Sequence, residues 1–291
     1  MAGSTLASRA LGRLLAHHRK QAGYTVYAAA QLLETSQQTL GRVEDGVKSK
    51  VPQIWINALA NAYNVGDDDR RVMIGLAQEL AQAQKNWWRA LADEMNPRFD
   101  HYVGLEDAAR SLAVWRVAVL PGLLQSAEYR RAIAWAEYPD MPTDQVERRV
   151  EIAVRRQSRL DNPNFSVDVV LSEYVLREQV GGSAVMHDQL KHLATMAERP
   201  NVSLRVVPFD APAQMGSIVG SFVLLEFPKL PQTGMVEPPV VFVEGYAGDL
   251  YLERETEVMR YRTAFAQISR VALNQEQTRQ LVLSIAKEYG E

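Results

Sequence analysis

The sequence predicts an α+β protein with an all-α N-terminal domain, residues 1–80, and a larger mixed α/β domain, residues 81–291. Three observations predict this. A chain of 291 residues is long enough for two domains. Apolar residues recur at helical spacing in the first part, whereas Val- and Phe-rich runs bounded by Pro or Gly alternate with helical segments in the second. Those apolar runs favour a sheet of about four to five strands with helices on at least one face.

Short helices joined by tight turns are expected in the N-terminal domain. Gly23 is placed to end the first helix. Thr25 and Ser36 are placed to cap the second and third helices, because hydroxyls accept hydrogen bonds from free N–H groups at helix starts. The acidic run 67–69 precedes the fifth helix, where it complements the helix dipole. Helices are expected over residues 6–21, 26–33, 37–44, 53–63 and 70–91.

The C-terminal domain mixes helical and strand periods. Strands are expected over residues 166–171, 202–207, 219–227, 239–244 and 249–252. Helices are expected over residues 104–115, 125–136, 142–160, 183–198, 254–269 and 275–288.

The composition argues against cysteine-based sites and against a membrane protein. The chain has no cysteine, which excludes disulfides, thiolate nucleophiles and Cys-based zinc sites. No apolar run approaches the roughly 18 residues of a membrane-spanning helix, and residues 1–20 hold no uninterrupted apolar signal region. We therefore expect no membrane association and a cytoplasmic location.

Catalytic motifs are missing from the sequence. His187 and His192 are five residues apart, which is not the spacing of helical zinc ligands. The segments GGSAV and GSIVG both depart from the nucleophile elbow, and neither a P-loop nor a dinucleotide fingerprint occurs. We expect no enzymatic activity, no cofactor and no metal.

One helical segment, 142–160, is rich in basic side chains: Arg148, Arg149, Arg155, Arg156 and Arg159. We interpret it as a solvated face with i,i+4 ion pairs. A surface for phosphate or an acidic partner is the alternative. The tryptophans and nearby tyrosines are interpreted as core, with a ligand pocket as the alternative.

Charge is distributed unevenly along the chain. Residues 1–66 carry seven Arg or Lys against three Asp or Glu, a charge of +4, and the rest carries −7 for a total of −3. A basic N-terminal segment followed by an acidic remainder is the pattern expected of a protein whose N-terminal domain binds phosphate groups.

The segment from Gly23 to Gly46 has the layout of a helix-turn-helix, with its turn at residues 34–35. Leu40 and Val43 are expected to anchor the second helix, whose first turns then fit the major groove of double-stranded DNA. The expected base-edge contacts come from Gln37, Gln38, Thr39 and Arg42. The expected phosphate contacts come from Thr25, Ser36, Lys48 and Lys50.

Residues 6–65 resemble the repressor-type helix-turn-helix domains of the XRE class, the family of phage repressors and Cro. The matching stretches are LGRLLAHHRKQAGYT and SQQTLGRVEDG, which fits S-x-x-x-[IVL]-x-[RK]-[IVW]-E-x-G. Three positions depart from the family. Val26 stands where the family commonly has Gln at the start of the second helix, Glu34 replaces the turn glycine of many members, and Gly41 lies inside the recognition helix. The resemblance implies a DNA-binding regulator, in most such cases a homodimeric repressor.

The remaining chain resembles actinobacterial WhiJ-like regulators, in stretches such as VLPGLLQSAEYRRAI, LSEYVLREQVGG and VVFVEGYAGDLYLE. This resemblance implies an XRE-type head joined to a large uncharacterised domain, often beside a small partner protein. Two alternatives to a simple repressor stay open: an antitoxin-like protein that binds a small partner protein, and a sensor gated by a small-molecule effector.

Overall fold

A computed structural model describes residues 6–47, 51–82, 99–212, 215–231, 233–246 and 248–290. The chain divides into two compact units. The first comprises Met1–Ala108 and Phe227–Glu237, and the second comprises Ala109–Glu226 and Pro238–Glu291. The N-terminal helical region followed by a mixed α/β domain confirms the predicted fold class.

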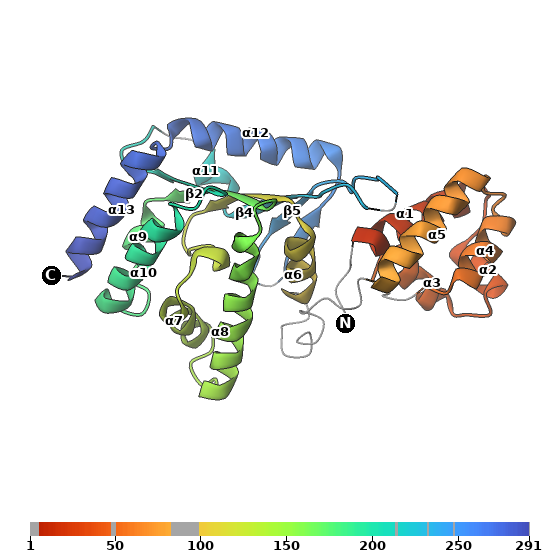
Figure 1. Ribbon diagram of the computed structural model, residues 1–291, viewed down its shortest axis with the longest axis horizontal. Helices are drawn as coiled ribbons and strands as arrows, with labels where there is room; N and C mark the ends of the chain where they lie inside the picture. The colour runs from red at the N-terminus through yellow and green to blue at the C-terminus, as the bar shows by residue number, and fades with distance from the viewer. Residues whose placement is uncertain are drawn as a thin grey trace. The chain divides into compact units, whose positions relative to one another are not determined.

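The first unit is built from short helices (Figure 1): α1 Leu6–Gln21, α2 Val26–Leu32, α3 Gln37–Glu44, α4 Gln53–Ala62, α5 Asp67–Gln82 and α6 Phe99–Ala108. Thr25 and Ser36 cap α2 and α3 as predicted. Helix α5 begins at Asp67, so the acidic run forms its first turn. Its predicted extension to residue 91 lies outside the described residues. The unit's fully buried side chains include Leu11, Leu40, Ile56 and Met73.

The second unit contains a six-stranded sheet in the order β3-β2-β1-β4-β5-β6. Strands β1, β2 and β3 are parallel to one another, and β4, β5 and β6 alternate in direction beyond β1. The carboxyl ends of β1, β2, β3 and β5 therefore lie at the same edge. The strands are β1 Ser111–Arg116, β2 Ser166–Ser172, β3 Val202–Val207, β4 Phe222–Glu226, β5 Val240–Val243 and β6 Leu250–Leu252.

Helices cover both faces of this sheet. Figure 1 shows α12 along one face and α7 and α8 on the opposite side. Trp115, Val170 and Phe222 on the sheet pack with Val258 and Ile268 of α12 in one buried cluster. The other helices are α7 Ala127–Glu137, α8 Thr143–Gln157, α9 Tyr174–Arg177, α10 Ser183–Met196, α11 Gly216–Val219, α12 Glu255–Val271 and α13 Gln275–Gly290, with the 3₁₀ turns η3 Gly122–Leu124 and η4 Ser158–Asp161.

The helix predicted over 104–115 is wrong in its second half. Helix α6 ends at Ala108, and residues 111–116 form β1, which pairs with both β2 and β4. A short apolar run is compatible with either a buried strand or a helix, and only pairing across the sheet decides between them. The sheet has six strands rather than four or five mainly for this reason.

The segment 227–237, between β4 and β5, is part of the first unit. Glu237 is buried there, and it pairs with Arg13 and lies 3.7 Å from Nε of Arg9, both on α1. The guanidinium of Arg9 also lies over the ring of Phe227, 5.9 Å from its centroid. Residues more than two hundred positions apart thus share one buried charge network.

Candidate nucleic-acid interface

The candidate interface is formed by α2, the following turn and α3, and both helices start at a hydroxyl cap. Thr25 Oγ1 accepts a hydrogen bond from the N–H of Ala28 at 3.1 Å, and Ser36 Oγ accepts one from Thr39 at 3.1 Å. The Ser36 and Thr39 hydroxyls also lie 2.9 Å apart. Thr25 and Ser36 are exposed, so their hydroxyls face solvent while they hold the helix starts.

Helix α3 has an apolar inner side and a polar outer side. Leu40 and Val43 are buried, at 0% and 2% exposure, and they anchor the helix to the rest of the unit. Gln38 and Arg42 are one helical turn apart on the exposed side. Gln37 is exposed as well, and Thr39 is half-buried. Of the side chains predicted to read bases, Gln38 and Arg42 thus share one exposed face of α3, whereas Thr39 lies at its half-buried edge.

Helix α1 supports the back of α3 through a very close approach at Gly12. A Cβ added there would lie 2.3 Å from the carbonyl oxygen of Glu44 and 2.6 Å from that of Val43. Ser8 Oγ, one turn earlier, donates a 2.7 Å hydrogen bond to the carbonyl of Gly46, which has a φ of +68°. The absence of a side chain at Gly12 therefore sets the depth at which α3 lies.

A buried ion pair fixes the same end of α3. Arg19 donates from Nε and Nη2 to the two carboxylate oxygens of Glu44 at 2.6 and 2.8 Å, and from Nη1 to the carbonyl of Tyr24 at 2.8 Å. The hydrogen bond with Glu44 raises the pKa of the Arg19 guanidinium. A bidentate pair of this kind fixes direction as well as distance. It orients α3 relative to α1.

The turn between the two helices contains a strained residue. Glu34 has a φ of 51°, in the left-handed region, and its side chain is exposed. Residues other than glycine and Asn seldom adopt this conformation, because the Cβ approaches the following carbonyl. The family's turn glycine would fit here without strain, and Glu34 also adds a negative charge beside the candidate interface.

Part of the predicted basic surface is engaged inside the protein. Arg19 pairs with Glu44, while Arg9 and Arg13 pair with Glu237. Glu44 is already counted in the +4 charge of residues 1–66, but Glu237 is not, so that charge overstates by one what these residues present to DNA. Lys20 and Arg42 are exposed. Lys48 and Lys50, the other predicted phosphate contacts, lie outside the described residues.

Sequence reasoning missed the supporting residues of α3. Gly12 and Arg19 lie in a stretch that carried the family resemblance, yet nothing in their local pattern indicates a partner on α3. Tyr27, on α2, is 61% exposed and adds an aromatic side chain to the outer surface of the helix pair. The Arg19–Glu44 pair had one available signal, since the acidic position is part of the SQQTLGRVEDG pattern.

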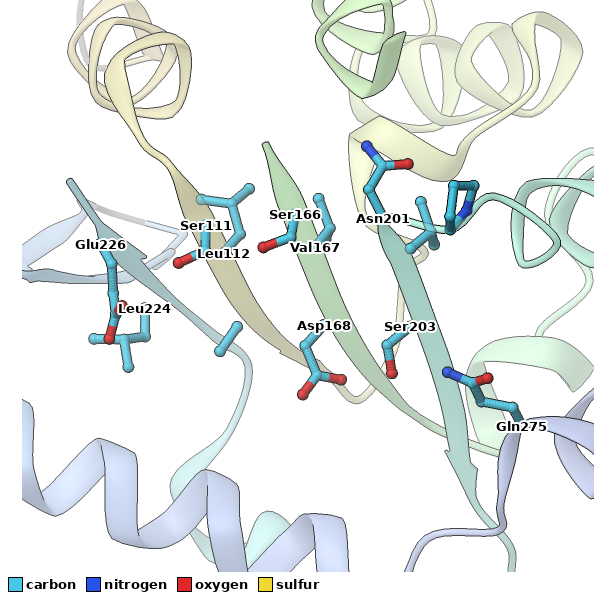
Figure 2. Close-up of a pocket in the computed structure, with 13 residues that line it drawn as sticks. Ser111, Leu112, Ser166, Val167, Asp168, Asn201, Ser203, Leu224, Glu226 and Gln275 are labelled. Carbon is cyan, nitrogen blue, oxygen red and sulfur yellow. The ribbon is translucent and has the colours of Figure 1, made fainter. Parts of the chain in front are cut away.

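The second unit has an open hollow of about 370 Å³ on one face of the sheet, lined by both polar and apolar side chains. Figure 2 shows Ser111, Ser166 and Ser203 lining it from three adjacent strands. Both of its carboxylates are paired: Asp168 with Arg205 at 2.8 Å, and Glu226 with Arg262 at 2.7 Å. The hollow offers hydroxyls and neutralised charges, and its lining pairs no nucleophile with a histidine or a free carboxylate.

The residues that the structure describes contain no group of three or more His, Asp or Glu side chains placed to hold a metal ion. Among them, no helix is both long and apolar enough to cross a membrane.

Comparison with known proteins separates the chain into the same two regions. A helix-turn-helix domain model matches residues 10–73, a span that contains α2 and α3. A domain of unknown function, DUF5753, matches residues 99–284, more than half of the chain. No curated protein and no solved structure matches. With its polar-faced α3 inside the first match, the protein carries a helix-turn-helix DNA-binding domain, and by the extent of the second match it belongs to the DUF5753 family.

Proposed function

We propose that the protein is a sequence-specific transcriptional repressor of the XRE class, within the WhiJ-like group, that reads the major groove with residues 36–44. The observation that supports this most directly is the two-sided character of α3. Gln37, Gln38 and Arg42 face solvent, whereas Leu40 and Val43 are buried. A polar face on a helix that is fixed from behind by Gly12 and Arg19 is suited to base edges.

Base readout is assigned by side-chain chemistry. Gln38 is suited to the N6 and N7 groups of adenine, and Arg42 to the O6 and N7 groups of guanine, with each good contact worth about 1–3 kcal/mol of discrimination. Arg42 makes no ion pair within the described part of the chain, so its guanidinium is free for a base. We assign no catalytic role to either unit.

Phosphate contacts are assigned to the edges of the helix pair. Thr25 and Ser36 lie at helix N-termini, where backbone and hydroxyl donors suit phosphate oxygens. Lys48 and Lys50 complete the proposed set. A single helix-turn-helix domain contacts only a short DNA site. We therefore propose a homodimer that binds two half-sites separated by about one turn of the DNA helix, ~34 Å.

Genome-wide recovery of DNA fragments on the purified protein tests the proposal. Wild type is compared with the double variant Gln38→Ala, Arg42→Ala and with Gln31→Ala, a control for an exposed glutamine on α2. We expect wild type and the control to enrich one short two-fold-related motif and the double variant to lose it. Enrichment of the same motif by all three would contradict the assignment of α3. No enrichment by wild type in moderate salt would favour the antitoxin-like, partner-binding alternative.

The division between base and phosphate contacts has its own test. Gln38→Ala should change the preferred base at one position of each half-site. Lys50→Ala should weaken binding to all sequences alike and reduce the slope of log K against log salt by about one. Affinities measured on a set of single-base operator variants, at three salt concentrations, distinguish the two effects. Indistinguishable profiles for both variants and wild type would refute these roles.

A further inference from the structure

The chain between strands β4 and β5 leaves the sheet and forms part of the helical first unit. This segment, residues 227–237, lies within the DUF5753 match yet is grouped with the helices of the DNA-binding region. Lys229 and Val236 face each other in an antiparallel bridge, and the N–H of Leu230 donates to the carbonyl of Met235 at 2.7 Å. We call residues 227–237 the β4–β5 arm.

Both ends of the arm contact one side chain of α1. Phe227 and Glu237, the first and last residues of the arm, are buried. The guanidinium of Arg9 lies over the ring of Phe227, 5.9 Å from its centroid, and its Nε lies 3.7 Å from the carboxylate of Glu237. Arg13, one helical turn further along α1, pairs with the same carboxylate. The arm is therefore fixed to α1 by ionic and aromatic contacts together.

The backbone of Arg9 contacts the end of α3. A Cβ added to Gly46 would lie 2.8 Å from the Cα of Arg9, so the two chains touch directly. Gly46 ends the helix in the left-handed region, with its N–H donating to the carbonyl of Val43 at 3.1 Å. Ser8 Oγ donates to the carbonyl of Gly46 at 2.7 Å. Arg9 thus lies between the arm, which its side chain contacts, and the last turn of α3, which its backbone contacts.

This chain of contacts leaves little room for independent movement. Closely packed atoms transmit a displacement to their neighbours, because the interior has few voids to absorb it. A buried guanidinium is also costly to separate from its carboxylate, so Arg9 should follow Glu237. Pro238 and Pro239 join the arm to β5, and their fixed φ angles stiffen that connection. A shift of the arm is therefore expected to reach Gly46.

We propose that the β4–β5 arm positions the recognition helix, so that the DUF5753 region supplies Phe227 and Glu237 as positioning residues for operator reading. In this role neither residue touches DNA, and both act through Arg9 on the end of α3. The inference rests on the proposed function of α3. It adds that a change in β4 or β5 alters operator recognition, since the arm continues both strands.

Hydrogen exchange of the full chain without DNA tests the physical link. Glu237→Gln should speed exchange of the Asp45 and Val47 amides, which close the end of α3, at least about tenfold. The Tyr63 amide at the end of α4 should change less than about twofold, because α4 is not part of this chain of contacts. Phe227→Leu keeps an apolar side chain and should act in the same direction by a smaller factor.

Two control variants separate positioning from a general loss of stability. Glu173→Gln also removes the charge of a buried carboxylate, but in the second unit, where Glu173 pairs with Arg177. Lys229→Gln changes an exposed charge within the arm itself. Both should leave exchange at the end of α3 as in wild type.

Discrimination between DNA sequences tests the consequence for reading. A loss of folded protein lowers the affinity for every sequence by the same factor, whereas a displaced α3 reads bases less well. Glu237→Gln should therefore reduce the ratio of affinities for the operator and a single-base variant at least about threefold. Operator binding to wild type should in turn slow exchange at Leu230 in the arm, since coupling between two sites is reciprocal.

The outcomes distinguish this proposal from the proposed function. Unchanged exchange at the end of α3 in both arm variants would overturn it, whether or not the protein binds an operator. Equal acceleration in α3 and α4 would also overturn it, because the arm would then stabilise the whole unit. Altered exchange with an unchanged affinity ratio would remove its role in reading. Failure of wild type to recognise any operator would refute the proposed function, and the exchange data would still decide whether the arm holds α3.

Discussion

The backbone of Glu34 stores strain that a single substitution can remove. Its φ of 51° costs about 1 kcal/mol relative to glycine, because only glycine lacks the Cβ that causes the clash. Glu34→Gly should therefore raise the free energy of unfolding by about 1 kcal/mol, measured by urea denaturation. It should also tighten DNA binding, since it removes an exposed negative charge from the turn.

Asn64→Gly is the control for this strain. Asn64 has a similar φ of 54°, but Asn tolerates the left-handed region and carries no charge. We expect a smaller gain in stability and no change in DNA affinity. A lower stability for Glu34→Gly would mean that the side chain contributes more than its backbone costs.

A half-buried histidine makes the stability of the second unit depend on pH. His192 lies on α10, and its Nε2 is buried without a hydrogen-bond partner among the described residues. Burial lowers its pKa below the unfolded value of 6.5. Between 6.5 and the lower native pKa the unfolded chain binds more protons, so stability falls as pH falls through this window.

His192→Leu should flatten that dependence. The free energy of unfolding, measured between pH 7.5 and 5.5, should decline less steeply than in wild type. His17→Gln, at an exposed histidine on α1, should leave the slope unchanged. An unchanged slope in His192→Leu would show that other groups cause the acid sensitivity.

At the scale of the element, alanine at Gly12 and alanine at Gly41 should change the stability of the protein in opposite directions. Gly12→Ala places a Cβ within 2.3 Å of a carbonyl of α3, so the recognition helix must shift, and we expect a loss of about 2–3 kcal/mol. Gly41 has open space around it, and alanine there should stabilise α3 by about 1 kcal/mol.

The two alanine variants should also differ in their affinity for DNA. Gly12→Ala should lose operator affinity by more than its unfolded fraction explains, because α3 is displaced. Gly41→Ala should keep or improve affinity if the backbone at this position does not touch DNA. Circular dichroism melts and fluorescence anisotropy on one operator measure both quantities. Wild-type behaviour of Gly12→Ala in both would contradict the close approach of α1 and α3.

Sequence signals predict a helix or strand well where its ends and faces depend only on residues nearby in the sequence. The caps at Thr25 and Ser36 fix the starts of α2 and α3, because a hydroxyl at a helix start acts within four residues. Strand β1 was misread because its side chains are buried by neighbours far away in sequence. The outward residues of α3 followed from its period, whereas Gly12 and the Arg19–Glu44 pair depend on the packing of α1, which the period does not specify.

At the scale of the whole molecule, the first unit depends on a segment that is distant in sequence. Arg9 is only 5% exposed, and the single carboxylate of Glu237 lies beside both Arg9 and Arg13. The predicted boundary near residue 80 lies where the run of short helices ends and helical and strand periods begin to alternate. The sequence contains no signal for a carboxylate more than two hundred residues away, since charge pairing over such a distance follows only from the fold.

A fragment of residues 1–82 should therefore be less stable than the same region in the full chain. The fragment keeps Arg9 but lacks Phe227 and Glu237, which contact its guanidinium in the full chain, so this ion pair and this packing are lost together. Arg9→Met should change the stability of the fragment by less than about 0.5 kcal/mol, because the side chain has already lost these contacts there. The same substitution should destabilise the full chain, where it leaves buried Glu237 with fewer cations. Urea denaturation of the four proteins measures this difference, and an equal change in both backgrounds would show that Glu237 does not balance Arg9.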